Sequence, residues 1–298
     1  MIKRIFLITV LGCILQFQAL ACDVCGCSIN GTGLGLMSAY RYNFVGMNWQ
    51  YASFEGSLLH GSGSIDHFHT AELAVRYHFT DNFKVLVNQP FKFNTRSLNG
   101  ETSQLQGLGD TRVLANYTFL KDKKIGGFDI YAELGAGAQL PVGQYDSDLH
   151  SKDLPENFNA GRGSWGWLAQ PNLILSKGNM GFIFNGSYQY NMATETGYRF
   201  GNQMTGQLLY FYRKDVNENF TVTPYGGVVG ERITQDIYPN GVLVGGTSGK
   251  GVFTSAGINL KVKDFLFSTA YSLPVWQLYS LNEVSAKSRI TAQVSYIF

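Results

Sequence analysis

The feature that most constrains this chain is a two-residue alternation of apolar and polar side chains, which recurs in segments of roughly 9 to 11 residues from about residue 43 onward. The segment AELAVRYHF at 71–79 is typical. One face carries Ala71, Leu73, Val75, Tyr77 and Phe79, and the other carries Glu72, Ala74, Arg76 and His78. Segments 110–119, 128–140 and 181–191 repeat the pattern, which predicts strands with one apolar and one polar face.

The composition indicates what covers the apolar face. Charged residues make up 15% of the chain and aromatic residues 14%, whereas soluble domains usually have about 25% charged residues. After residue 21 no run of about 18 apolar residues occurs, which excludes membrane-spanning helices. We therefore predict an all-β fold, a closed antiparallel up-and-down transmembrane β-barrel with lipid on its outside. A formal net charge of +2 gives no reason to expect a nucleic-acid partner.

The connections between the predicted strands alternate in length. Short polar connections at 80–82, 121–126, 176–179, 214–219 and 261–264 alternate with longer ones at 56–65, 97–107, 143–162 and 234–250. This predicts about 12 strands in residues 43–298, with 10 or 14 as alternatives, and places both termini in the periplasm. The predicted strands lie near 43–56, 66–79, 83–95, 108–120, 127–141, 163–176, 180–192, 199–213, 219–232, 250–262, 265–276 and 286–298.

The first 21 residues have the pattern of an export signal. Lys3 and Arg4 precede an apolar run at 5–15, and Ala19 and Ala21 supply the small-x-small pattern of a signal-peptidase site. The run is shorter than the ~20 residues that cross a bilayer, so residues 1–21 are predicted to be a cleaved signal peptide.

Three cysteines follow the predicted cleavage site within a Gly-rich segment, 22–42, that we expect in the periplasm. The C-x2-C-x-C spacing of Cys22, Cys25 and Cys27 suits Cu or Zn bound by thiolates. An oxidising compartment favours a disulfide instead. As a third alternative, Cys22 would be the first mature residue and a lipidation site, although Ala19 replaces the usual leucine three residues before it.

Histidines near the second predicted strand form a weaker metal candidate. His67 and His69 are two residues apart on one strand face, and with His60 and Asp66 they offer ligands for a divalent ion. No Gly-x-Ser-x-Gly motif accompanies them, so we predict that the chain is not an enzyme. No cofactor is expected to be required.

The segment LQGLGDTRVLANYTF at 105–119 resembles the Gly-x-Gly-Asp strand opening of the outer-membrane family named for the meta-pathway of phenol degradation, and TDNFKVLVNQPFKF at 80–93 resembles the family's preceding turn and strand. This resemblance implies a transporter barrel distantly similar to the long-chain fatty-acid channel. Gly107 and Gly109 suit a bulge or a positive φ at the barrel rim. Asp110 is expected to pair with Arg112 or Arg76.

Together these observations predict a porin-like passive outer-membrane channel or transporter for a small solute, with an apolar or aromatic cargo suggested by the family resemblance. Inward-facing Glu72, Arg76, Asp110, Arg112 and Glu133 are expected to line the lumen and set its selectivity. Aromatic residues Tyr131, Trp165, Trp167, Tyr210 and Tyr225 are further lumen candidates, although some of these rings are expected to belong to the interfacial girdles. Expected partners are outer-membrane lipid and, through the terminal strand that ends at Phe298, the barrel-assembly machinery. The alternative function is metal handling by the cysteines, with the barrel mainly an anchor.

Overall fold

The computed structural model describes residues 42–56, 63–152 and 154–298. The predicted signal peptide, the three cysteines of residues 22–27 and His60 lie outside these ranges, and the hypotheses about them stay predictions.

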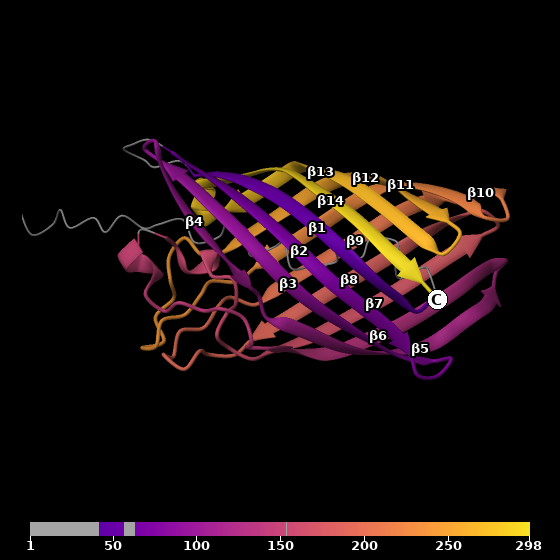
Figure 1. Ribbon diagram of the computed structural model, residues 1–298, viewed down its shortest axis with the longest axis horizontal. Helices are drawn as coiled ribbons and strands as arrows, with labels where there is room; N and C mark the ends of the chain where they lie inside the picture. The colour runs from indigo at the N-terminus through magenta and orange to yellow at the C-terminus, as the bar shows by residue number, and fades with distance from the viewer. Residues whose placement is uncertain (1–41, 57–62, 153) are drawn as a thin grey trace, which may run out of the picture.

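In the part of the chain that the structure describes, fourteen strands belong to one antiparallel sheet that closes on itself. The strands are β1 (Phe44–Gly56), β2 (Ser64–His78), β3 (Phe83–Leu98), β4 (Glu101–Leu108), β5 (Thr111–Ile125), β6 (Phe128–Leu140), β7 (Gly166–Lys177), β8 (Met180–Asn191), β9 (Gln203–Tyr212), β10 (Lys214–Asn217), β11 (Phe220–Ile233), β12 (Gly249–Val262), β13 (Phe265–Tyr279) and β14 (Val284–Ile297). Because β14 pairs with β1 from Phe44↔Ile297 onward, and β9 pairs with β11, the ring is closed (Figure 1). Within the described residues, β4 and β10 are short extensions and the other twelve strands form the barrel wall, which confirms the predicted architecture.

Strand β4 corrects one sequence prediction. Residues 97–107 were expected to be a loop, but β3 and β4 pair through Leu98↔Glu101 and project beyond the barrel as a hairpin (Figure 1). The two turn residues, Asn99 and Gly100, have φ values of 55° and 85°. An Asn-Gly turn of this kind matches the twist of the flanking strands, which is why the pair forms a tight hairpin and not an open loop.

The two faces of the wall differ as the alternation predicted. On β2 the outward side chains Leu73 and Tyr77 are 50% and 48% exposed, whereas the inward Glu72 and Arg76 are 2% and 3% exposed. Burial on this sheet therefore means facing the lumen, and exposure means facing outward. Among the described residues, no helix has the length and hydropathy required to cross a membrane.

The connections gather by length at opposite ends of the barrel. Tight turns such as those at 126–127, 178–179 and 263–264 lie at one end, where the chain also ends, and the long connections 141–165, 192–202 and 234–248 lie at the other (Figure 1). We call these the turn end and the loop end. Short 3-10 helices occur only in loop-end connections of the described chain: η3 (Leu149–Lys152), η4 (Glu156–Phe158) and η5 (Ser280–Asn282).

Candidate functional site

The connection at 141–165, here called the mouth loop, crosses the loop end of the barrel. It leaves β6 and returns to β7, and in the ring order the gap between β13 and β14 lies directly opposite. Its apolar residues nevertheless pack against that far wall. The cluster joins loop residues Leu149, Leu154 and Phe158 to wall residues Ala52, Phe54, Phe68, Ile233, Phe253, Tyr279, Val284 and Ala286. The wall residues come from β11, β12, β13, β14, β1 and β2, so the mouth loop spans the opening to reach them.

Phe158 is the central contact of the mouth loop. Its ring is fully buried and meets the ring of Phe68 at 4.9 Å between centroids, and the guanidinium carbon of Arg96 lies 5.0 Å from its centroid. The side chain of Asn94 donates a hydrogen bond to the carbonyl oxygen of Phe158 at 2.8 Å. Burying a phenylalanine side chain is worth about 1.5–3 kcal/mol, so this contact holds the loop inside the mouth.

Both ends of the mouth loop are tied to one carboxylate, that of Asp110. Its oxygens accept the backbone N–H of Gly143 at 3.0 Å and of Arg162 at 2.7 Å, and also the side-chain amide of Gln139 at 2.9 Å. The predicted partners of Asp110 are therefore wrong, since Arg112 pairs with Glu72 and Asp110 serves the loop backbone. A carboxylate that accepts several N–H groups is a strong anchor, because each of these bonds is charge-assisted.

Glycines make this anchor possible. A Cβ atom at Gly143 or Gly161 would lie 2.7 or 2.8 Å from Asp110 Oδ1, which is closer than real Cβ contacts. At Gly109 a Cβ would lie 3.0 Å from the carbonyl oxygen of Ala160 in the loop. The predicted bulge is present here, because the five residues from Leu108 to Arg112 lie opposite the four from Phe91 to Asn88. Neither Gly107 nor Gly109 has a positive φ, so close approach to the mouth loop explains them.

Two further carboxyl groups lie in the loop-end connections, Glu156 in the mouth loop and Asp236 in the 234–248 connection. Asp236, in the 234–248 connection, accepts the hydroxyl of Tyr198 at 2.6 Å and the backbone N–H of Gly201 at 2.6 Å. Burial raises the pKa of Asp236 to about 6. Burial also raises the pKa of Glu156 in η4 to about 7, and the charge of Asp236 adds to that shift. Each of the two loops thus carries a buried carboxyl group, and their charges repel each other when both are ionised.

Ion pairs line the lumen below the mouth loop. Glu72 and Arg112, both predicted lumen residues, form one pair, and Asn88 donates to Glu72 at 3.0 Å. Asp66 and Arg96 form a bidentate pair with both distances at 2.7 Å, while Glu231 and Arg289 form another at 2.6 and 2.8 Å. Pairing offsets part of the cost of burying these inward charges.

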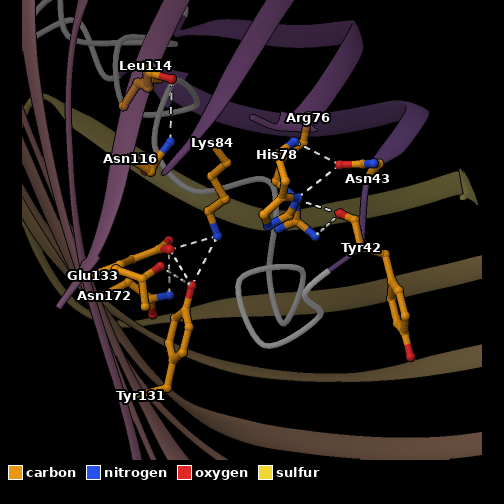
Figure 2. Close-up of polar contacts among 11 residues, drawn as sticks. Tyr42, Asn43, Arg76, His78, Lys84, Leu114, Asn116, Tyr131, Glu133 and Asn172 are labelled. Atoms are coloured by element: carbon orange, nitrogen blue, oxygen red, sulfur yellow. Dashed lines mark hydrogen bonds and ion pairs between the residues drawn. The ribbon is translucent and has the colours of Figure 1, made fainter. Parts of the chain in front are cut away.

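Arg76 and Glu133, the remaining predicted lumen residues, lie in two separate hydrogen-bonded groups near the turn end (Figure 2). The Nζ atom of Lys84 lies 2.7 Å from Glu133, and the hydroxyl of Tyr131 donates to Glu133 at 2.5 Å. Arg76 donates twice to the carbonyl oxygen of Tyr42, at 3.0 and 2.8 Å. Tyr42 and Tyr131 also line an open pocket of about 360 Å³ at this end of the barrel. Cations and a carboxylate therefore face the same end of the lumen.

Sequence reasoning missed Lys84, Arg96, Glu231 and Arg289, and it assigned Asp66 to a metal site. The signal was present for Asp66, because it falls in phase with Glu72 on the polar face of β2. Three of the five aromatic candidates face outward and not into the lumen: Trp165, Trp167 and Tyr210 are 50%, 58% and 43% exposed. Tyr131 and Tyr225 do face the lumen, in an apolar cluster with Ile183 and Leu209.

His67 and His69 share a face, as predicted, but it is the outer face of the barrel. Tyr51 Oη lies 2.9 Å from His67 Nδ1, and its ring lies 4.9 Å from that of His69. Asp66 points into the lumen and cannot join them, so that part of the metal hypothesis is wrong. Within the described residues, no group of three or more His, Cys, Asp or Glu side chains is placed to hold a metal.

The fold has solved counterparts, although no protein-family model and no curated protein matches the sequence. An outer membrane channel from Pseudomonas putida F1 superposes with a TM-score of 0.62 at 12% identity, covering 86% of this chain and 96% of that one. The β domain of the Bordetella autotransporter BrkA gives 0.51 at 12% identity, covering 86% of this chain and 100% of that one. These similarities show the barrel fold alone, and the resemblance to the phenol-degradation family stays a prediction.

Proposed function

We propose that this chain is a passive channel of the bacterial outer membrane for a small solute, and that the mouth loop restricts its outer opening. The observation that carries the proposal is the apolar contact across the mouth, in which Phe158 from the β6–β7 connection packs against Phe68 on β2. A loop held by packing and by a few hydrogen bonds can be displaced without unfolding the wall, because the wall is held by its own backbone ladder.

Membrane insertion is supported by the outward face of the wall. Its exposed side chains are apolar along the strands, and rings collect near the turn end, where Tyr77, Phe79 and Phe83 contact one another, as do Phe265, Tyr296 and Phe298. Aromatic girdles of this kind flank the apolar band of outer-membrane barrels. In this proposal the loop end faces outside and both termini lie in the periplasm, with the strand that ends at Phe298 recognised during barrel assembly.

The lining favours an uncharged solute with apolar or aromatic character. Ion pairs neutralise Glu72, Asp66 and Glu231 inside the barrel. Apolar side chains of the mouth loop and the wall pack together at the loop end, and Tyr131 and Tyr225 add aromatic surface to the lumen. A solute with an exposed ring makes favourable apolar contacts with these surfaces, whereas a sugar of equal size does not.

Liposome swelling tests the proposal. The purified barrel is reconstituted and swelling is measured in isosmotic solutions of an aryl glucoside and of a disaccharide of similar size. We expect swelling with both and a faster rate with the aryl glucoside. No swelling above protein-free liposomes would contradict the channel, and equal rates would contradict only the preference for an aromatic solute.

A further inference from the structure

A row of side chains crosses the outer surface of the wall at the loop end. The register places Met204 of β9, Arg232 of β11, Lys250 of β12 and Leu278 of β13 directly beside one another. Arg232 and Lys250 are exposed, while their chain neighbours Ile233 and Gly249 are buried. The two cations therefore point outward as the central pair of the row.

Two like charges directly opposite on neighbouring strands repel each other. Among the described residues, neither Arg232 nor Lys250 forms an ion pair with a carboxylate, and Glu231 points into the lumen toward Arg289. Lys250 lies 5.4 Å from the ring centroid of Trp276. The pair would be stabilised by an anion bound between the two cations.

A pocket of about 430 Å³ lies at this pair and is lined by both cations. Thr234 and Ser248 add hydroxyl groups to its lining, while Leu278 and Leu281 add apolar surface. A guanidinium and an ammonium beside hydroxyl donors suit the oxygens of a phosphate group. The apolar lining adjoins these donors, so the pocket suits a ligand that has an anionic head and an apolar part.

The backbone presents Leu281 in an unusual way. Ser280, Leu281 and Asn282 have φ values of 47°, 56° and 74°, a left-handed run that non-glycine residues rarely adopt. Leu281 is 80% exposed at the tip of the β13–β14 hairpin, although it lines the pocket. Strained backbone of this kind is concentrated at functional sites in proteins. Here it holds the apolar side chain of Leu281 beside two cations.

The position of the row along the barrel axis agrees with a lipid ligand. Val275 and Trp276, farther from the loop end on β13, are 67% and 50% exposed on the outer face. Tryptophan is enriched where the hydrocarbon meets the headgroups, so the cations next to it lie at headgroup level. We propose that this pocket binds the phosphate of a phosphorylated lipid in the outer leaflet, with Arg232 and Lys250 on the phosphate and Leu278 and Leu281 against the lipid's apolar part. This inference rests on the membrane insertion in the proposed function.

Native mass spectrometry of the detergent-purified barrel, titrated with bisphosphorylated lipid A as the probe, tests the site. We expect the double variant Arg232→Gln/Lys250→Gln to bind about tenfold more weakly or worse, since two charge-assisted contacts are lost. The matched control Lys214→Gln/Lys263→Gln removes the same charge from the turn end and is expected to bind as the wild type does. Equal weakening in both double variants would overturn the site in favour of general charge attraction.

Two further measurements distinguish the phosphate of a lipid from free inorganic phosphate. Dephosphorylated lipid is expected to bind the wild type as weakly as phosphorylated lipid binds the Arg232→Gln/Lys250→Gln variant. Inorganic phosphate is expected not to displace lipid A at equal concentration; displacement would assign the site to the free ion and overturn the lipid. Conductance of the same variants is measured in parallel and is expected to be unchanged. Wild-type lipid binding by the Arg232→Gln/Lys250→Gln variant, with intact conductance, would overturn this inference alone. Absence of conductance in every variant overturns the proposed channel.

Discussion

The carboxylate of Asp110 accepts the backbone N–H of Arg162 at a donor–acceptor distance of 2.7 Å, which joins the start of β5 to the far end of a loop 52 residues away in sequence. The same carboxylate accepts the N–H of Gly143 at the near end of the loop. One side chain thus closes the base of the mouth loop.

Replacing Asp110 by alanine is expected to loosen this base. Hydrogen bonds to a charged group contribute roughly 1.5–3 kcal/mol each, so loss of this acceptor should raise protease cleavage within the mouth loop at least about tenfold. Limited proteolysis of the reconstituted barrel measures this. The control Asp264→Asn, at an exposed turn at the other end, is expected to leave cleavage unchanged, and the anchor is refuted if Asp110→Ala does the same.

Truncating Phe158 to alanine is expected to release the loop from the far wall. Removing a buried phenylalanine costs about 3–5 kcal/mol, and here the loss falls on the loop and not on the strand ladder. Single-channel conductance should rise while heat-modifiable migration on gels stays normal. Phe119→Ala, which removes a ring from the outer face, is expected to leave conductance as in the wild type, and a Phe158→Ala channel no larger than wild type would contradict the packing role.

The barrel wall was predictable because its strands follow from the alternation of side chains that are close in sequence. A two-residue rhythm assigns each side chain to lipid or lumen, and this placed Glu72, Arg76, Arg112 and Glu133 correctly inside. The β3–β4 hairpin was not predicted, although the Asn99-Gly100 dipeptide is typical of the tight turn that joins these two strands. The alternation does not predict the direction of a side chain next to a loop, so it did not decide whether Trp165 faces the lumen or a girdle.

The mouth loop was not predictable by the same reasoning. Residues 143–162 have no periodicity, and the partners of Phe158 lie on strands that are near it only after the ring closes. The role of Asp110 depends on glycines more than 30 residues away that let the loop approach. Such contacts follow from closure of the barrel and not from any local pattern.

Conductance is expected to rise with pH. The pKa of Glu156 is raised to about 7 in the closed structure, and that of Asp236 to about 6, so the closed loops hold their protons more tightly than released loops do. This stabilisation is complete at pH values below the ordinary carboxyl pKa and is lost as the pH rises through about 7, when both groups ionise side by side. Planar-bilayer recordings between about pH 5 and pH 8 measure the effect.

Glu156→Gln is expected to keep the loops closed over this pH range and to flatten the dependence. Glu101→Gln, on the exposed β4 hairpin, serves as the control and should retain the wild-type profile. A channel that opens on acidification would show that the coupling has the opposite sign.

Ion selectivity is expected to respond to the Lys84–Glu133 pair near the turn end. Glu133→Gln removes a negative charge beside Lys84 and should shift the reversal potential in a salt gradient toward anions, whereas Lys84→Gln removes a positive charge and should shift it toward cations. Shifts of the same sign in both variants, or none in either, would exclude these residues from the conduction path.

The most direct test replaces the middle of the mouth loop. Asp146 and Asn159 are hydrogen-bonded at 2.8 and 3.0 Å, so the ends of segment 147–158 lie close together and a short Gly-Ser linker can join them without disturbing the Asp110 anchor. Single-channel conductance of this variant is compared with that of the wild type in the same bilayer. The account predicts a several-fold larger and pH-independent conductance, and an unchanged conductance would contradict the claim that this loop closes the barrel.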